Sequence, residues 1–127
     1  MLLAPTIPGL TDHEIPSLVE AAAAAGARSA SYVMLRLPYA VAPLFEAWLG
    51  EHFPARKDKV LNQLRAVRKG KLYDSTFGQR MRGEGIFAEQ VDALFEVACR
   101  KHGLNGKLPT LNTTGFRRVE KAQLSLF

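Results

Sequence analysis

Residues 4–38 read APTIPGLTDHEIPSLVEAAAAAGARSASYVMLRLP, and this stretch decides the fold of the chain. Residues 4–10 are apolar and contain a Pro-Gly pair, and residues 31–37 are a second apolar run rich in strand-favouring residues. Between them the sequence predicts a helix over residues 16–25, which Gly26 ends. Strands joined by a crossover helix normally pair in parallel, so this stretch predicts one βαβ unit with strands covered on both faces.

Three further helices are predicted, each from an apolar stripe at helical spacing. The first opens near Pro43, and its stripe comprises Leu44, Phe45, Trp48 and Leu49. The second spans residues 56–69, with an apolar side that comprises Val60, Leu61, Leu64 and Val67. The third spans residues 86–102 and carries Phe87, Val91, Leu94, Phe95 and Ala98. The chain is therefore predicted to be α/β, with a βαβα part over residues 1–53, a basic helical extension over 54–103 and an extended tail over 104–127.

Charge is distributed unevenly along the 127 residues, whose formal net charge is +5. Residues 1–53 contain two basic and five acidic side chains, whereas residues 54–127 contain fifteen basic and seven acidic ones. The basic second part predicts an anionic partner. Its candidate nucleic-acid contacts, expected to face away from the apolar side of their helix or to follow it, are Lys57, Arg65, Arg68, Lys69 and Lys71. A basic amphipathic helix is also an ordinary solvated surface, so both interpretations stay open.

Common catalytic and metal-binding patterns are missing from the sequence. The single Cys99 excludes an internal disulfide and a cysteine-based cluster or zinc site within the chain. His13, His52 and His102 have no second ligand at metal spacing, and no phosphate-binding glycine loop or nucleophile with a matching base is found. No apolar run approaches the roughly 18 residues of a membrane span, and residues 1–10 do not resemble a signal peptide. We therefore expect a cytoplasmic protein with no membrane contact and no metal site of its own.

The carboxyl ends of the two predicted strands are the natural place for a ligand, as in other parallel α/β proteins. Residues 8–12 follow the first strand, and Arg36 and Tyr39 lie at the end of the second. At Gly9 a ligand could approach the backbone closely because no side chain intervenes. The alternative is a simple turn glycine and an arginine that forms a salt bridge.

Residues 5–12, PTIPGLTD, resemble the G-x-I-x-G-x-x-E stretch on the fifth strand of radical S-adenosylmethionine enzymes. Ile7 and Gly9 match that pattern, whereas Pro5 replaces its first glycine and Asp12 replaces its glutamate. The longer series of APTIPGLTDHEIP, YVMLRLP, LFEAWL, a basic helix and GKLYDSTFGQRMRGEG is similar to the carboxyl-terminal part of a bacterial subfamily related to spore photoproduct lyase. This resemblance covers nearly the whole chain.

The resemblance implies a fold, a chemistry and a missing partner. The fold is the C-terminal portion of a partial (βα)6 TIM-like barrel, to which this chain gives about two parallel strands, the fifth and the sixth. The complete enzyme would use a 4Fe-4S cluster to cleave S-adenosylmethionine and abstract hydrogen from an unknown substrate, with DNA repair as one setting. The implied cofactor-binding residues are Thr6, Ile7, Pro8 and Gly9, and the substrate-side candidates are Arg36 and Tyr39.

One departure from the family pattern concerns the cluster. The family holds it with a C-x3-C-x2-C loop, which this sequence lacks and which Cys99 cannot replace. The chain alone is therefore expected to be inactive, and its first expected partner is the missing N-terminal half of the barrel.

The carboxyl terminus carries a separate signal. Gln123, Leu124, Leu126 and Phe127 belong to the sequence QLSLF, which is similar to the pentapeptide that docks bacterial repair and replication proteins onto the DNA sliding clamp. A flexible end could deliver the three apolar side chains into a groove while the glutamine bonds at its edge. The alternative is an apolar end that folds back onto the domain. A non-catalytic module that binds nucleic acid or the sliding clamp is thus the alternative function.

Overall fold

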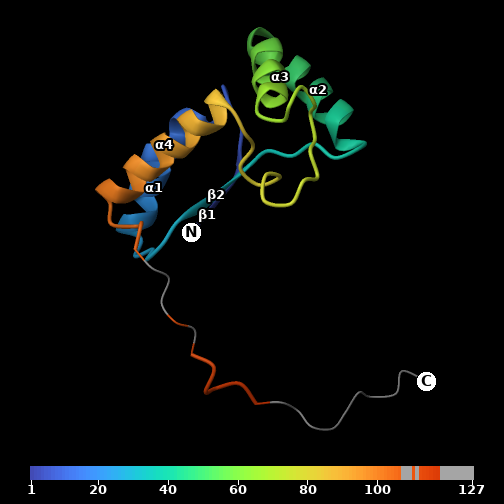
Figure 1. Cartoon of the computed structure of the whole chain (residues 1–127). Helices are drawn as coiled ribbons and strands as arrows, with labels where there is room; N and C mark the ends of the chain where they lie inside the picture. Colours follow the sequence, from blue (N-terminus) through green and yellow to red (C-terminus); the bar gives the residue numbers. More distant parts are fainter. Residues whose placement is uncertain (107–109, 111, 118–127) are drawn as a thin grey trace, which may run out of the picture.

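The protein was analysed as a computed structural model that describes residues 1–106, 110 and 112–117 (Figure 1). Within these residues the elements are β1 (Leu2–Thr6), α1 (Ile15–Ala24), β2 (Ser31–Met34), α2 (Val41–His52), α3 (Lys57–Ala66) and α4 (Ile86–Lys101). Short 3-10 turns, η1 (Asp12–Glu14) and η2 (Pro54–Arg56), precede α1 and α3. β1 and β2 pair in parallel. The chain is therefore a mixed α/β protein, as its sequence predicted.

Both strands end earlier than the sequence predicted. β1 stops at Thr6 because the chain then closes a tight turn, in which the amide of Thr11 donates to the carbonyl of Ile7 at 2.9 Å. Beyond Met34, one more hydrogen bond joins the two strands, because the amide of Leu35 donates to the carbonyl of Thr6 at 2.8 Å. The number of residues over which a strand is paired thus depends on the neighbouring strand. The apolar pattern of one strand does not indicate it.

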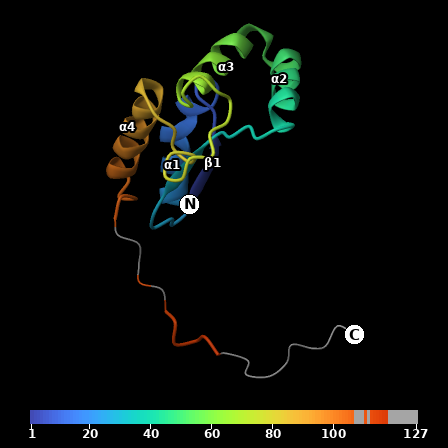
Figure 2. The same cartoon turned by 45° about the vertical axis from the view of Figure 1, so that its right-hand side comes forward.

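One face of the sheet is covered by α1 and α4, which lie side by side (Figures 1 and 2). Tyr32 and Met34 of β2 point into this layer and are almost fully buried. The first core cluster consists of Ile15, Val19, Tyr32, Met34, Val67, Ala88, Val91, Phe95, Ala98, Cys99 and Leu104. Burial of this many apolar side chains makes the α1/α4 layer the main source of hydrophobic stabilisation on this face.

A second core cluster lies where α2 and α3 pack together, beyond the carboxyl ends of the strands (Figure 1). Its buried members are Ile7, Leu10, Leu37, Leu49, Val60, Leu61 and Leu64. Residues 7–10 and Leu37 come directly after the two strands, so this cluster fixes α2 and α3 to the sheet.

The opposite face of the sheet is not covered by any helix of the described residues. Ala4 and Pro5 of β1 are exposed, and Val33 of β2 is half-buried. The expectation that both faces of the strands are covered is therefore wrong for the described part of the chain. β1 also has β2 as its single strand neighbour there, which leaves its outer edge open.

The helix predictions are largely confirmed. α1 and α4 lie within one residue of the predicted limits, and the predicted apolar side of α3 is buried. α2 departs from its predicted stripe, because Leu49 is buried whereas Leu44 is 70% exposed and Trp48 is 39% exposed. Leu49 is a buried member of the second core cluster and Phe45 packs against it, whereas Leu44 and Trp48 lie outside that cluster.

The tail is described in part. Leu104 is buried in the first core cluster, and the described residues 110 and 112–117 lie outside helices and strands and are exposed. The predicted clamp-binding residues Gln123, Leu124, Leu126 and Phe127 lie outside the described residues. No helix in the described part of the chain has the length and apolar character that crossing a membrane requires.

Candidate functional site

The carboxyl ends of β1 and β2 lie at one edge of the sheet, where the four predicted cofactor-binding residues are found. The side chains of Thr6, Ile7 and Pro8 are buried there, and Ile7 belongs to the second core cluster. Gly9 is half-buried. A ligand at this turn would therefore meet backbone groups rather than the three buried side chains.

Gly9 is closely approached by a side chain of α3. Its φ of +75° is a left-handed conformation that favours glycine, and its amide donates to Oδ2 of Asp12 at 3.0 Å. A Cβ placed on Gly9 would overlap the side-chain carbonyl oxygen of Gln63. That oxygen is buried and has no hydrogen-bond partner among the described residues. In this structure the predicted close approach at Gly9 is thus made by Gln63, a residue that the sequence did not single out.

Arg68 occupies a different place from the one predicted. The helical pattern put it on the solvent side of its helix as a candidate nucleic-acid contact, but it is 1% exposed. Its guanidinium donates hydrogen bonds to three backbone carbonyls, those of Arg80 at 3.1 Å, Leu35 at 2.8 Å and Met34 at 3.4 Å. Burial lowers the pKa of this group. Arg68 therefore ties the end of β2 to the loop over residues 70–85, and it is not available to a phosphate backbone.

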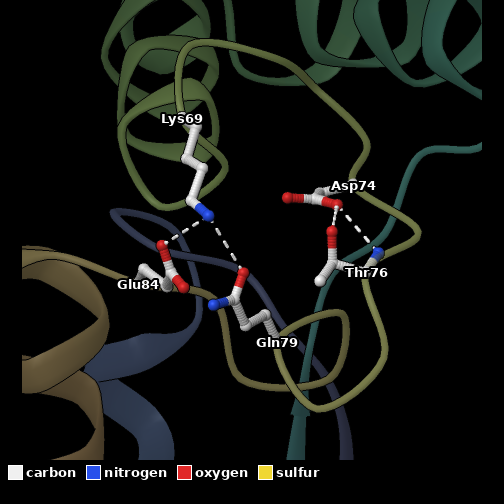
Figure 3. A network of polar contacts seen from close by, with 5 residues as sticks. All are labelled: Lys69, Asp74, Thr76, Gln79 and Glu84. Atoms are coloured by element: carbon white, nitrogen blue, oxygen red, sulfur yellow. Dashed lines mark hydrogen bonds and ion pairs between the residues drawn. The ribbon is translucent and has the colours of Figure 1, made fainter.

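Lys69 is held in a polar network at the base of the same loop (Figure 3). Its Nζ lies 3.1 Å from Oε2 of Glu84 and donates to Oε1 of Gln79 at 3.1 Å. Nearby, the backbone amide and the hydroxyl of Thr76 both donate to Oδ1 of Asp74, at 2.8 and 2.6 Å (Figure 3). These hydrogen bonds from Thr76 lower the pKa of Asp74. The charge of Lys69 is thus partly neutralised within the chain.

The loop returns close to the end of α3. The amide of Glu84 donates to the carbonyl of Val67 at 3.0 Å, and a Cβ on Gly83 would lie 2.8 Å from that same oxygen. Gly83 also has a φ of +79°, a left-handed conformation that favours glycine. Both this conformation and the short distance to the carbonyl of Val67 therefore require a residue without a side chain. The two ends of the loop are therefore fastened together.

The other candidate nucleic-acid contacts differ in their surroundings. Lys57 forms an ion pair with Glu46, with Nζ and Oε1 3.4 Å apart. Arg65 donates to the side chain of Asn62 at 3.4 Å, and Lys71 is exposed. The structure therefore does not gather the five predicted cations into one free basic surface, because one is buried and two are ion-paired.

A second arginine, Arg82, holds the returning end of the loop against the covered face of the sheet. Its Nη1 lies 3.1 Å from Oδ1 of Asp92, which also accepts from the hydroxyl of Tyr32 at 3.0 Å. The guanidinium carbon lies 3.9 Å from the centre of the Tyr32 ring, a cation–π distance. Burial raises the pKa of Tyr32. This cluster has a structural role, and its members are 50 or more residues apart in sequence, apart from the Arg82–Asp92 pair.

An open hollow of about 450 Å³ lies on the uncovered side of the sheet, and we call it the sheet hollow. Its apolar wall is formed by Ala4 and Pro5 of β1, Val33 of β2, and Pro38 and Val41 at the start of α2. The volume is within the usual range for small-molecule sites. The hollow lies on the face of the sheet that no described helix covers.

The polar wall of the sheet hollow includes one predicted substrate-side residue and one residue that was missed. Arg36 and Tyr73 both line it, although 37 positions separate them. Tyr39, the other predicted residue, does not line the hollow but lies beside it, with its ring centre 6.1 Å from that of Tyr73. Tyr39 is 90% exposed and has a φ of +44°, a strained conformation for a tyrosine. The structure thus brings Arg36 and Tyr39 into one neighbourhood and adds Tyr73 to it.

The residues present do not fit an iron–sulfur cluster. The described residues contain no group of three or more His, Cys, Asp or Glu side chains that could hold a metal ion. Cys99 is 3% exposed within the first core cluster, and its burial raises the pKa of the thiol.

Comparison with models of protein families, with curated proteins and with solved structures found no match to this chain.

Proposed function

We propose that this chain is the carboxyl-terminal part of a radical S-adenosylmethionine enzyme and supplies the last two strands of its partial barrel. The observation that carries the proposal is the difference between the two edges of the sheet. The outer edge of β2 is occupied, because the amide of Met34 donates to the carbonyl of Met81 at 2.8 Å and Arg68 binds the neighbouring carbonyls. The outer edge of β1 has no neighbouring strand in the described part of the chain.

This asymmetry fits the position that the resemblance implies. If β1 and β2 are the fifth and sixth strands of six, further strands must pair with β1 and none with β2. The placement of the helices supports the same arrangement, because α1 and α4 cover one face and leave the other open. In a (βα) barrel the helices lie outside and the opposite face of the strands lines the interior.

The chain would contribute to cofactor binding through the backbone after β1. The turn over residues 7–12 is closed by its own hydrogen bonds, which fixes the position of Gly9 at the carboxyl edge of the sheet. In the complete enzyme S-adenosylmethionine, given one electron by the cluster, would supply the hydrogen-abstracting radical. Pro8 and Gly9 of this chain would hold its adenosine part through main-chain atoms.

The proposal is tested first by isolating every native polypeptide that contains this sequence, under anaerobic conditions, with an antibody against residues 71–103. We expect the purified material to contain a three-cysteine loop, either on the same chain or on a tightly bound partner, and about four iron atoms per complex. A native polypeptide of 14.0 kDa that co-purifies with no iron protein would overturn the proposal.

A second test uses glycine variants of that native enzyme. Gly9→Ala should weaken S-adenosylmethionine binding at least tenfold by calorimetry, because the added methyl group overlaps Gln63 and shifts the turn whose main-chain atoms would hold the adenosine part. Gly26→Ala is the matched control, since Gly26 also has a positive φ, of +86°, but has open space around its Cβ position and ends α1 at the other edge of the sheet. Equal binding by the two variants would contradict the assignment of Gly9.

The alternative function, a non-catalytic nucleic-acid-binding module, has less support. Arg68 is buried, and Lys57 and Lys69 are ion-paired, so three of the five candidate contacts are engaged within the chain. Docking onto the sliding clamp stays a prediction from the sequence QLSLF. Its test is saturable binding of a fluorescent peptide of residues 122–127 to the clamp, with a Leu126→Ala, Phe127→Ala peptide as the control.

A further inference from the structure

We propose that the sheet hollow binds a small ligand that combines a flat ring with an anionic group. This inference deepens the proposed function, on which it rests for the expectation that the ligand is the substrate. The site itself is built from this chain's own residues, so it can be tested without the iron cluster. Three observations carry it: the charge around Arg36, the start of α2, and the pair of tyrosine rings.

The first observation is an excess of positive charge at one end of the hollow. Arg36 lines the hollow and forms no ion pair or hydrogen bond with any other described residue. The buried guanidinium of Arg68 is close enough for the charge of Arg36 to lower its pKa. Two neighbouring arginines repel each other, and an anion bound to Arg36 in the hollow would reduce that repulsion. A planar guanidinium suits a carboxylate or a phosphate, to which it can donate two parallel hydrogen bonds.

Asp74, the acidic group that acts on Arg68, does not remove this excess. Asp74 is next to Tyr73 and interacts with Arg68 through space, but one of its oxygens accepts two hydrogen bonds from Thr76 (Figure 3). Its charge is also balanced by the nearby Lys69 and Lys71. Asp74 is therefore already engaged in its own loop.

The second observation is the start of α2. Val41, the first residue of this twelve-residue helix, lines the hollow. The amides of Val41 and Ala42 already donate to the carbonyls of Pro38 and Tyr39, and Pro43 has no amide, so this end of the helix offers no free N–H group to an anion. The start of α2 therefore gives the hollow an apolar wall, and the charge that favours an anion there is that of Arg36.

The third observation is the aromatic wall. Tyr73 lines the hollow, and the ring of Tyr39 lies 6.1 Å from it with an angle of 47° between the two planes. Tyr39 holds a left-handed backbone conformation while its side chain stays exposed, a combination that costs conformational energy and buries little surface. The ring of Tyr73 offers the face on which a flat ligand would stack, and Tyr39 lies beside it. The apolar floor of Ala4 and Val33 would accept the body of the same ring.

Two kinds of compound carry the required chemistry, nucleoside monophosphates and aromatic carboxylates. The experiment titrates the 127-residue chain, labelled with ¹⁵N, with adenosine monophosphate, thymidine monophosphate and indole-3-acetate as probes. Adenosine and inorganic phosphate serve as half-ligands. We expect at least one ring-plus-anion probe to bind with shifts centred on Arg36, Val41 and Tyr73, and at least tenfold more tightly than either half-ligand. The better probe identifies the source of the anion.

Variants decide whether the hollow is the site. Arg36→Gln should weaken binding tenfold or more, and Tyr73→Ala should weaken it to a similar extent. Arg28→Gln is the matched control, because Arg28 is exposed in the turn before β2 and its loss removes the same charge from the other end of the sheet. If Arg36→Gln fails to fold, as judged by its unfolding midpoint, Arg36→Lys keeps the charge and loses the planar donor pair, and should weaken binding less than Tyr73→Ala.

The inference is overturned if no probe binds, if half-ligands bind as well as complete ones, or if Arg28→Gln and Arg36→Gln weaken binding equally. Each of these outcomes leaves the iron content of the native enzyme untouched. Conversely, if the native protein lacks iron but the probes bind in a way that depends on Arg36, the proposed binding site stands and the proposed radical chemistry is overturned. The failures of the two proposals are therefore distinguishable.

Discussion

The two faces of the β1–β2 sheet are made by alternating residues of the same short strands, yet their surroundings differ. Tyr32 and Met34 are buried in the first core cluster, whereas Val33 and Ala4 line the sheet hollow, which Met34 also borders. The covered face carries the packing that holds the chain together. The open face carries a cavity with an unpaired arginine among the described residues, and so has properties of a binding surface. The difference teaches that alternating residues of one strand can have very different surroundings, packed on one face and open on the other.

The largest expected effect tests this separation directly, with two neighbouring residues of β2. Met34→Ala should lower the free energy of unfolding by about 2–5 kcal/mol, because it leaves a cavity in the first core cluster. Val33→Ala should cost less than about 1 kcal/mol, because Val33 faces the hollow. Urea denaturation followed by circular dichroism measures both. Equal losses would mean that the two faces are equally packed.

Arg68 joins the end of β2 to the loop over residues 70–85, and its removal should have the next largest effect. Arg68→Met keeps much of the buried volume but leaves three backbone carbonyls without their donor, so we expect a loss of about 2–4 kcal/mol. Arg65→Met is the control, since Arg65 makes a single long side-chain hydrogen bond with Asn62. Should both variants unfold at the same urea concentration, Arg68 would not be a structural tie.

The pKa of the Cys99 thiol tests whether the covered face of the sheet excludes water. Burial raises the pKa of its thiol in the folded state, whereas the unfolded chain has the ordinary value near 9.0. The stability that this thiol contributes is therefore fully present at a pH below the pKa of the unfolded chain. It is lost as the pH rises through the higher pKa of the folded state. The free energy of unfolding should therefore fall more steeply above about pH 9 in the native sequence than in Cys99→Ala. Parallel pH profiles would show that the thiol is solvated in the folded chain.

The smallest effect is expected at the base of the loop over residues 70–85. Lys69 and Glu84 form an ion pair whose side chains are 57% and 36% exposed, so their coupling should be no more than about 1 kcal/mol and should weaken in salt. A double-mutant cycle with Lys69→Ala and Glu84→Ala, at low and high ionic strength, measures it. A coupling that is large and independent of salt would place this pair in a far less polar environment.

The sequence predicted the elements better than it predicted their surroundings. Periodicity and turn residues were enough for the βαβ unit and for the limits of α1 and α4, because these depend on neighbouring residues in the chain. The ends of the strands depended on the length of the partner strand, and the exposure of Leu44 and Trp48 depended on which residues of α2 pack in the second core cluster. Such features are set by residues far away in sequence.

The candidate site shows the same limit. Arg36 and Tyr39 could be located at a strand end from the sequence, but Tyr73 reaches them through a loop whose path has no sequence periodicity. Arg68 has the spacing of an exposed helical residue, and its acceptors at positions 34, 35 and 80 are invisible to a helical pattern. Tyr73 and the acceptor at position 80 both belong to residues 70–85, GKLYDSTFGQRMRGEG, which apart from Lys71 entered the sequence predictions only through the family resemblance.

The fastening of the loop ends has a consequence for proteolysis. Val67 accepts from the amide of Glu84 beside the close approach of Gly83, and Arg82 is anchored to Asp92, so the loop is closed at its base independently of its tip. Residues 75–78 at that tip are exposed. A protease that cuts there would produce two fragments that remain associated, because the anchoring contacts and the first core cluster join them on either side of the cut. The nicked chain would migrate as two bands in denaturing gels and as one species in native ones.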